Sequence, residues 1–546
     1  MCGILAVFGN IDAATATAAD ESSDRMSHRG PDGRGMALIP GRGVLCHRRL
    51  AIMDPAHGHQ PIYGRDGAAV VHNGEIYNYR RLVQDLAVVG RSCNSGSDSE
   101  VIVHLYEAIG EGCVALLDGI FAFAVIHGDE WLVARDPIGV KPLYWGRDAA
   151  GNLWFASELK ALVDRCETFS EFPPGHMMTR RGGLRRWYAP AWMRENPPPP
   201  GNPAALRACL DAAVDKRLMS DVPLGVLLSG GLDSSLIAAL ATRRLRARDP
   251  EAVVHSFAIG IEPDAPDLKA AREVAAFLGT THHEVLFRVE DGIAALADIV
   301  RHVESYDVPT IRASIPMFLL SRYIRDQGVK VVLSGEGSDE IFGGYLYFYG
   351  AESPEALRRE TVARVADLHL SDVLRADKST MAHGVEARVP FLDMAFLDLA
   401  MSLQPELKQP RRPQSGQDGR MEKWILRAAF ADPADPLIPP AVLWRQKEQF
   451  SDGVGYGWVD GLRDHAARVV PAEALARASE RFPHATPATA EAYLYRELFD
   501  ALFPGDQAAR CVIRWTPRWQ ASGDTSGRAN PLHQHASDRL LRLVAR

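Results

Sequence analysis

Two patterns of hydrophobic and polar positions divide the chain into two parts. The first part contains short alternating apolar runs, such as residues 121–126, separated by glycine turns, and this pattern predicts a strand-rich domain. The second part contains compact apolar runs at 224–228, 253–261 and 329–333, with helical patterns between them. That alternation predicts a parallel β-sheet covered by helices. Beyond about residue 370 the apolar spacing is mostly helical.

A proline-rich segment separates these two parts. Residues 194–203 read RENPPPPGNP, and four consecutive prolines favour an extended, semi-rigid linker. The 546 residues are also too many for one ordinary hydrophobic core, so at least two domains are expected. We therefore expect one domain at residues 2–190 and a second at residues 203–525.

Charge, cysteine usage and hydropathy exclude several classes of protein. The formal net charge of −8 gives no reason to expect nucleic-acid binding. Seven cysteines without a CxxC pair argue against a disulfide framework or a structural zinc site, and they suit a reducing compartment. No apolar run approaches the ~20 residues of a membrane span, and no basic region precedes the apolar residues 3–8. These features predict a cytoplasmic protein with neither a nucleic-acid nor a membrane partner.

The second residue is the first candidate for chemistry. If Met1 is removed, Cys2 becomes the first residue, and its thiol and a free α-amino group share one residue. A free α-amine has a pKa of roughly 7.7–8.0, so at neutral pH it can accept the thiol proton. Nucleophile and base would then arrive together. A cysteine at this position by chance is the alternative.

Other short motifs supply the groups that such a nucleophile needs. An acyl-transfer site for a free amino acid requires a thiolate, an oxyanion hole, a cation for the α-carboxylate and an anion for the α-ammonium. These roles can be filled, in that order, by Cys2, Asn73 with the Gly74 amide, Arg49 and Asp98. Each has a plain alternative: an Asn-Gly hairpin turn, a surface arginine and an aspartate that caps a helix.

Together these motifs resemble the glutaminase domain of class II glutamine amidotransferases, from Cys2 to about residue 190. Further matching strings are FAF at 121–123, RD at 135–136, GVKPLY at 139–144 and SELK at 157–160. The resemblance implies an α+β sandwich of two antiparallel β-sheets flanked by helices. It also implies a catalytic set and a glutamine-binding set, namely Cys2, Asn73 and Gly74 for catalysis and Arg49, Asn73, Gly74, Glu75 and Asp98 for glutamine.

A second candidate site follows the first strand of the second part. Residues 227–235 read LLSGGLDSS, between a predicted strand and a predicted helix. Small residues let backbone amides approach an anion closely, and the helix N-terminus adds a favourable dipole. The lysine of a Walker A loop is absent. A plain serine/glycine turn is the alternative. The string resembles the pyrophosphate loop of ATP pyrophosphatases, which cut ATP between its α and β phosphates.

The second site gains acidic and basic candidates from later motifs. Residues 334–340, SGEGSDE, follow another predicted strand and therefore lie at the same sheet edge. Asp233 and Asp339 could hold Mg²⁺, which prefers oxygen ligands. Lys447 would supply a cation for the transferring phosphate, and Glu336 a base for an attacking ammonium. Their alternatives are a helix cap for Asp339, a surface charge for Lys447 and an arginine partner for Glu336.

Nearly the whole chain resembles glutamine-hydrolysing asparagine synthetases. The supporting strings are LLSGGLDSS, SFAIG at 256–260, SGEGSDEIFGGY at 334–345, HGVEARVPFLD at 383–393 and WRQKEQFSDGVGY at 444–456. The resemblance implies an α/β nucleotide-binding domain with a helical C-terminal part. It places ATP against Leu227, Ser229, Gly230, Gly231, Leu232, Asp233, Ser234, Ser235, Ile259, Ser334 and Gly335. Pro309 departs from the family pattern, which has a threonine there, and no family role is known for the basic tail at 536–546.

The implied reaction makes asparagine from aspartate and glutamine, with ATP as substrate and Mg²⁺ as cofactor. A β-aspartyl-AMP intermediate would receive ammonia released at Cys2 through a sheltered passage, giving AMP and pyrophosphate. A homodimer is compatible with this interpretation. Three alternatives weigh less: a cyclising synthetase would need no reactive Cys2, a phosphoribosyl or sugar amidotransferase would need no LLSGGLDSS, and a binding-only relative would have lost Cys2, Asp233 or Glu336.

Overall fold

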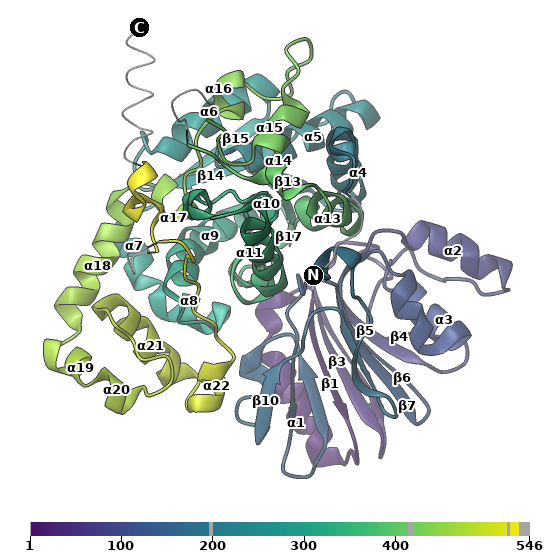
Figure 1. Cartoon of the computed structure of the whole chain (residues 1–546). Helices are drawn as coiled ribbons and strands as arrows, with labels where there is room; N and C mark the ends of the chain where they lie inside the picture. The colour runs from purple at the N-terminus through teal and green to yellow at the C-terminus, as the bar shows by residue number, and fades with distance from the viewer. Residues whose placement is uncertain (1, 196–199, 413–418, 521–524, 534–546) are drawn as a thin grey trace, which may run out of the picture.

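The computed structural model describes residues 2–195, 200–412, 419–520 and 525–533. Figure 1 shows a strand-rich N-terminal domain beside a larger, helix-rich C-terminal domain, with the N-terminal end of the chain at their junction. Most of the proline run and the whole basic tail at 536–546 lie outside the described residues. No helix in the described ranges is long and apolar enough to cross a membrane.

The N-terminal domain is built on two six-stranded antiparallel sheets. The first sheet has the order β10-β8-β9-β1-β3-β2, and the second has the order β12-β11-β7-β6-β5-β4. The strands of the first sheet are β1 (Gly3–Phe8), β2 (Gly33–Ile39), β3 (Gly43–Arg49), β8 (Tyr144–Arg147), β9 (Leu153–Ala156) and β10 (Thr168–Glu171). Those of the second sheet are β4 (Ile62–Tyr63), β5 (Ala69–Ile76), β6 (Gly119–His127), β7 (Glu130–Arg135), β11 (His176–Thr179) and β12 (Gly183–Arg186).

Alternate residues of these strands form a core between the two sheets. Ile4 and Ala6 of β1 pack in one cluster with Val71 of β5 and with Ala122 and Ala124 of β6. Three helices flank the sheets: α1 (Ala13–Asp24), α2 (Tyr79–Val88) and α3 (Glu100–Ile109). α1 lies against β1 and β3, and α3 against β4–β6. The expected α+β sandwich of antiparallel sheets with flanking helices is confirmed.

The C-terminal domain is built on a five-stranded parallel sheet of order β15-β14-β13-β16-β17. Its strands are β13 (Leu224–Leu227), β14 (His255–Gly260), β15 (Thr281–Leu286), β16 (Val331–Leu333) and β17 (Glu386–Arg388). The helices around it include α4 (Leu206–Arg217), α5 (Leu232–Arg248), α6 (Pro266–Leu278), α7 (Val289–Ala294), α8 (Leu296–Val303), α9 (Val308–Asp326), α10 (Ser338–Phe342) and α11 (Pro354–Asp367). The expected parallel α/β sheet is confirmed.

The region after residue 370 is helical with one exception in the described ranges. Its helices are α12 (Asp372–Met381), α13 (Met394–Met401), α14 (Pro405–Lys408), α15 (Trp424–Phe430), α16 (Pro440–Leu443), α17 (Phe450–Gly453), α18 (Gly457–Val469), α19 (Ala472–Ala476), α20 (Ala478–Arg481), α21 (Ala490–Leu502) and α22 (Asp506–Arg510). The exception is β17, which adds an edge strand to the sheet. Its sequence, Glu-Ala-Arg, has no apolar run that would predict a strand.

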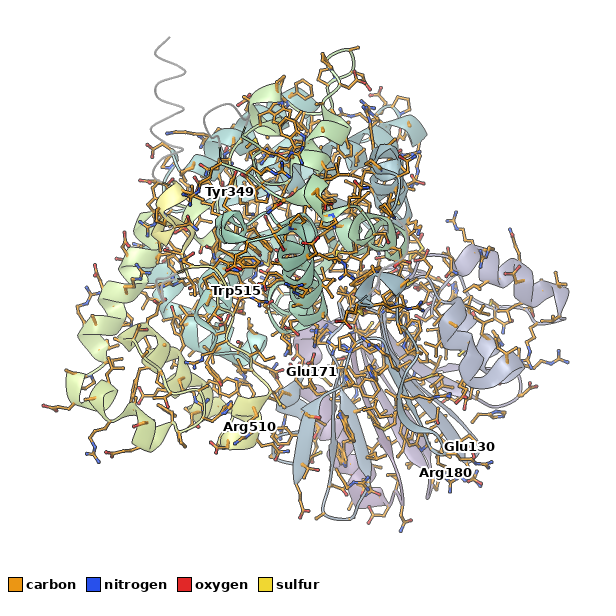
Figure 2. The ribbon with its side chains drawn as sticks, viewed as in Figure 1. Glu130, Glu171, Arg180, Tyr349, Arg510 and Trp515 are labelled. Atoms are coloured by element: carbon orange, nitrogen blue, oxygen red, sulfur yellow. The ribbon has the colours of Figure 1, made fainter. Side chains whose placement is uncertain are left out.

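The two domains pack through apolar as well as charged contacts. One hydrophobic cluster joins Ile120 and Val140 of the N-terminal domain to Leu392 of the C-terminal domain. Charged pairs add to this contact: Glu171, which Figure 2 labels at the boundary, lies 3.1 Å from the Nε2 atom of His369. A packed interface of this kind holds the two domains in a fixed relation.

Two candidate active sites

Cys2 precedes β1 of the first sheet and contacts β5 of the second sheet. The Cys2 backbone N–H donates to Asn73 Oδ1 at 2.9 Å, and the Sγ atom lies 4.0 Å from the Leu50 carbonyl oxygen. Cys2 is 7% exposed. Burial raises the pKa of its thiol, so a base close by is needed to form the thiolate.

Asn73 and Gly74 lie inside β5, where they pair with Ala122 and Phe121 of β6, so they do not form a hairpin turn. Gly74 has φ of +143°, and a Cβ there would lie 1.9 Å from the Ile120 carbonyl oxygen, so only glycine fits. The buried Nδ2 of Asn73 has no hydrogen-bond partner among the described residues. A donor of that kind is suited to an oxyanion.

Arg49 and Asp98 come from two different elements of the N-terminal domain. Arg49 ends β3, next to β1, and its guanidinium donates to the carbonyl oxygens of Asp54 at 2.7 Å and Pro55 at 2.9 Å. Asp98 Oδ2 accepts the Ile76 N–H of β5 at 2.7 Å. Both side chains are buried, so Arg49 is no surface charge, and the N-cap of α3 is residue 99, not Asp98. Burial raises the pKa of Asp98 to about 6.

Glu75 points toward the second domain. Its Oε1 lies 3.2 Å from the Nη2 atom of Arg388 in β17, and Arg388 also pairs with Glu386 at 2.6 Å. Burial raises the pKa of Glu75. The structure therefore joins Cys2 to Asn73 directly, whereas Glu75 is held by an ion pair across the domain interface.

Arg29 is a functional candidate that the sequence analysis left unassigned. Its Nε–H donates to the Cys2 carbonyl oxygen at 3.0 Å, and its Nη1 lies 3.0 Å from Glu158. The side chain is completely buried. The string HRGPDG at 28–33 is rich in turn residues, and nothing in it shows that its arginine folds back onto Cys2.

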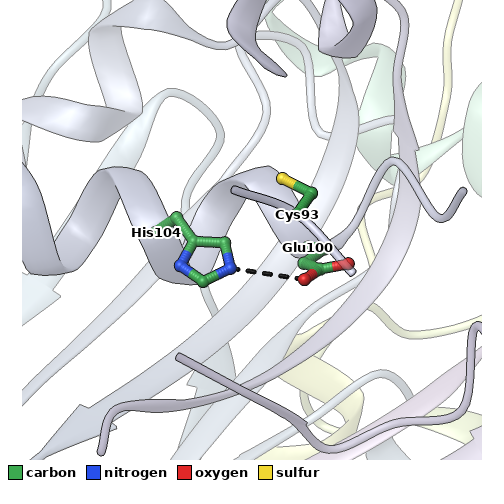
Figure 3. Close-up of side chains that lie close together, drawn as sticks. All are labelled: Cys93, Glu100 and His104. Carbon is green, nitrogen blue, oxygen red and sulfur yellow. Dashed lines mark hydrogen bonds and ion pairs between the residues drawn. The ribbon is translucent and has the colours of Figure 1, made fainter. Parts of the chain in front are cut away.

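Cys93, Glu100 and His104 lie close together at the loop that carries Asp98 (Figure 3). Glu100 accepts the N–H groups of residues 94 and 95, each at 2.7 Å, and lies 3.3 Å from His104 Nε2. Burial opposes ionisation here, but these hydrogen bonds outweigh it and lower the pKa of Glu100 to about 2. The ligand atoms of the three side chains lie within 4.8 Å of one another. Because Glu100 accepts both backbone N–H groups, it holds residues 94 and 95 in place.

The second site is a cavity at the carboxyl edge of the parallel sheet. Of the residues expected at ATP, nine line it: Leu227, Ser229, Gly231, Leu232, Asp233, Ser234, Ile259, Ser334 and Gly335. Glu336, Asp339 and Lys447 line it too. Two expected residues, Gly230 and Ser235, do not line the cavity.

Gly230 and Ser235 instead shape the loop. Gly230 has φ of +70°, and a Cβ there would come within 2.5 Å of the backbone at residues 270–271. Its carbonyl oxygen accepts from Arg445 Nη1 at 3.0 Å. Ser235 lies in the first turn of α5, with its N–H bonded to Gly231 O at 3.1 Å. The turn therefore aims the N-terminus of α5 into the cavity, where its dipole favours an anion.

A buried lysine links the two acidic candidates, and the sequence analysis missed it. Lys423 Nζ lies 2.5 Å from Asp233 Oδ2 and 2.6 Å from Asp339 Oδ1. Lys447 Nζ lies 2.8 Å from Asp339 Oδ2. Burial opposes ionisation of Asp339, but the two lysines lower its pKa to about 2. Lys423 is 1% exposed. Its backbone φ of +58° lies in the left-handed region, which is uncommon for a residue other than glycine.

Asp233 and Asp339 are a suitable pair of ligands for Mg²⁺. Both are carboxylates that line the cavity and converge on one cation, Lys423 Nζ, so their oxygens face a common point. Carboxylate oxygens are the ligands that Mg²⁺ prefers. Neither residue is a surface charge, and Asp339 does not cap α10, whose N-cap is Gly337.

Glu336 faces the cavity and has an arginine partner. Both of its carboxylate oxygens lie 3.1 Å from Arg375 Nη2, and this arginine also pairs with Asp372 at 2.7 Å. Burial raises the pKa of Glu336 to about 7, although Arg375 opposes the rise. The arginine pairing left open by the sequence is therefore present, and it does not remove Glu336 from the cavity wall.

Pro309 lies in the first turn of α9 and lines the cavity. A proline is tolerated there because the first N–H groups of a helix have no partner within the helix. Asp307 caps the helix and accepts from the Thr310 N–H at 3.1 Å. Pro309 is therefore compatible with the first turn of α9, and it presents no hydroxyl to the cavity.

Family models match both domains. A model described as glutamine amidotransferase domain matches residues 1–179, and one described as asparagine synthase matches residues 205–354 and 350–523. "Asparagine synthetase [glutamine-hydrolyzing] 2" of Arabidopsis thaliana is 51% identical, over 97% of this chain and 94% of the relative. "Asparagine synthetase [glutamine-hydrolyzing]" of Zea mays is 49% identical, over 98% and 94%.

These matches define an amidotransferase domain joined to a synthetase domain. The chain belongs to the glutamine-hydrolysing asparagine synthetases, a family of carbon–nitrogen ligases, and the resemblance inferred from its motifs is confirmed. Among solved structures, glutamine phosphoribosylpyrophosphate amidotransferase from B. subtilis, complexed with ADP and GMP, is 19% identical with a TM-score of 0.31. The match covers 52% of this chain and 81% of the amidotransferase chain, and the likeness is too distant to bear on function.

Proposed function

We propose that the protein makes L-asparagine from L-aspartate, ATP and L-glutamine through β-aspartyl-AMP, releasing AMP and pyrophosphate. The observation that carries the proposal is one cavity that holds the LLSGGLDSS turn, two converging carboxylates and Lys447 at the end of a parallel sheet. The membership of the chain in its family supports the same reaction. The domain boundaries 2–190 and 203–525, the cytoplasmic location and a homodimer remain predictions.

The first half-reaction takes place at Cys2 after removal of Met1. The α-amine, held by Asn73 Oδ1, takes the thiol proton, and Sγ attacks the side-chain amide carbon of glutamine. Asn73 Nδ2 and the Gly74 amide stabilise the oxyanion. Ammonia leaves with a proton from the α-ammonium, and water then hydrolyses the thioester to glutamate. Arg49 and Asp98 bind the α-carboxylate and α-ammonium of the substrate.

In the second half-reaction a β-carboxylate oxygen of aspartate attacks the α-phosphorus of ATP, and pyrophosphate leaves. The loop at 229–235 and Lys447 bind the phosphates, because backbone amides and an ammonium stabilise the charge that develops there. Mg²⁺ held by Asp233 and Asp339 would supply further charge neutralisation on pyrophosphate. Glu336 takes a proton from ammonium, and ammonia then expels AMP from the β-carbonyl carbon.

Ammonia must pass from Cys2 to the adenylate without reaching bulk water. The buried pair of Glu75 with Arg388 lies at the interface, and Arg388 belongs to the strand beside β16, which leads into the loop that carries Glu336. The apolar packing across the interface supports a passage that excludes water.

The products from ATP test this function. With aspartate, ATP and glutamine, we expect equal amounts of asparagine, AMP and pyrophosphate, resolved by chromatography. The reason is the absence of a Walker A lysine from LLSGGLDSS. ADP and inorganic phosphate as the main products would contradict the adenylate mechanism.

Lys423 offers a test that is specific to the second site. Lys423→Met should lower ammonia-dependent synthesis by roughly 10²–10³-fold, the scale expected when one charge-stabilising group is removed. The reason is that Lys423 holds Asp233 and Asp339 in the positions from which they would bind Mg²⁺. Glutamine hydrolysis should stay near the wild-type rate. The control is Lys269→Met, an exposed lysine of α6, and loss of both activities in a folded Lys423→Met protein would contradict the assignment.

A further inference from the structure

Helix α12 lines the synthetase cavity on one side and contacts the N-terminal domain on the other. Side chains in an α-helix are about 100° apart, so residues 375 and 377 point to nearly opposite sides of α12. Arg375 points to the cavity, which it lines together with Asp372. Asp377 contacts Arg29 and Lys378 contacts Tyr144, both in the N-terminal domain. One helix of ten residues thus spans the domain interface.

On the cavity side, α12 is held by charge. Arg375 Nη2 lies 3.1 Å from both oxygens of Glu336 and 2.7 Å from Asp372 Oδ1. These groups lie where the nucleotide, the amino acid and ammonium are proposed to bind. A charged ligand that pairs with Glu336 or Arg375 therefore changes the forces on this side of the helix.

On the opposite side, α12 forms ion pairs with two basic residues of the N-terminal domain, one of which bonds the Cys2 backbone. Asp377 Oδ2 lies 2.8 Å from Arg29 Nη2, and Asp377 Oδ1 lies 3.5 Å from Lys141 Nζ. Arg29 in turn donates from Nε to the Cys2 carbonyl oxygen at 3.0 Å. The next residue, Lys378, lies 2.5 Å from Glu304 and 2.9 Å from the Tyr144 hydroxyl.

The contacts around Asp377 are buried and depend on charge. Arg29 and Lys141 are fully buried, and the side chain of Asp377 is 2% exposed. Neither oxygen of Asp377 has a hydrogen bond of good geometry within the described chain, so the carboxylate is held by its ion pairs. Charges in a dry interior interact more strongly than at a surface. A small movement of Asp377 therefore acts directly on Arg29.

We propose that α12 couples the two active sites, with Asp377 and Arg29 as positioning residues that set the Cys2 backbone according to the occupancy of the synthetase cavity. The inference rests on the proposed role of Cys2 as nucleophile. ATP and aspartate, bound at one end of the helix, change the reactivity of Cys2 at the other. Because such coupling is reciprocal for binding, glutamine at Cys2 also changes the affinity for aspartate and ATP.

The test compares glutamate formation from glutamine with and without ATP and aspartate. In the wild type we expect these ligands to change kcat/KM for glutamine about fivefold or more, the lower range of allosteric coupling. In Asp377→Asn that response should vanish, while ammonia-dependent synthesis stays within about threefold of wild type. The matched control is Asp118→Asn, which breaks another ion pair across the interface, between Lys216 and Asp118 at 2.8 Å. It should keep the response.

A second measurement uses the wild type alone, in case Asp377→Asn folds poorly. The rate of Cys2 alkylation by iodoacetamide, followed by mass spectrometry of the N-terminal peptide, should change when ATP and aspartate are added. If the rates of Cys2 alkylation and of glutamine hydrolysis are the same with and without ATP and aspartate, the proposed coupling is wrong. A response that persists in folded Asp377→Asn would overturn the route through Asp377. Alkylated Cys2 with intact glutaminase activity would instead overturn the proposed nucleophile.

Discussion

Cys2→Ala should abolish glutamine-dependent asparagine formation and leave ammonia-dependent formation within about threefold of wild type. The thiol is the group that attacks glutamine, so its removal stops ammonia release. The synthetase cavity lies in the other domain, and Cys2 is not among its lining residues. Alanine also fits the buried position without a charge or a larger volume. Both activities are measured on the same preparation, one with glutamine and one with an ammonium salt.

Two controls sharpen the Cys2 experiment. Cys209→Ala changes a half-buried free thiol on α4 and should leave both activities unchanged. A peptide tag fused directly before Cys2 should reproduce the selective loss, because the α-amine that serves as base becomes an amide. A folded Cys2→Ala protein that fails to use free ammonia would contradict the division of work between two sites.

Much of the fold could be predicted from the sequence because its strands are marked by apolar runs. Residues 3–8 form β1, and the runs at 121–126 and 224–228 form β6 and β13 within one or two residues. The edge strand β17 could not be found this way. It has three residues, two of them charged, and its buried Arg388 pairs with Glu386 of the same strand and with Glu75 of the N-terminal domain.

The candidate sites could be predicted where a motif is local, and not where charges meet only after folding. LLSGGLDSS and SGEGSDE each follow a strand, so their meeting at one sheet edge follows from the parallel topology. Lys423 is 190 residues from Asp233, and nothing in its string MEKWILR marks it as the cation between two carboxylates. Arg29 and Arg375 were missed for the same reason.

The plain alternatives weighed at the sequence level had mixed outcomes. Asn73 and Gly74 lie within a strand because β5 continues through them. Their pairing with β6 outweighs the tendency of Asn-Gly to form a hairpin turn. Asp98 bonds the backbone of β5 instead of capping α3. Glu336 does pair with an arginine, and this pairing leaves it on the cavity wall. Gly230 and Ser235 shape the phosphate turn without lining the cavity, because a glycine with φ of +70° sets the direction of the loop.

Glu336→Gln should lower amide formation by roughly 10²–10⁴-fold, the usual scale for removal of a general base. Glutamine keeps the size and one acceptor oxygen of the side chain but cannot take a proton from ammonium. Adenylate formation does not need this base. Exchange of labelled pyrophosphate into ATP in the presence of aspartate should therefore survive much better than asparagine synthesis. The control is Glu355→Gln on the exposed side of α11, which should change neither activity.

The pH dependence separates a base from a merely structural carboxylate. Burial raises the pKa of Glu336 to about 7, so its ionised, proton-accepting form predominates above that pH and is lost below it. At fixed total ammonium, the wild-type rate should rise toward pH 7 and flatten above it. In Glu336→Gln the rate should keep rising about tenfold per pH unit, because the variant depends on the small fraction of ammonia that is already neutral. An equal loss of exchange and synthesis, with an unchanged pH profile, would make Glu336 a nucleotide-binding residue and not the base.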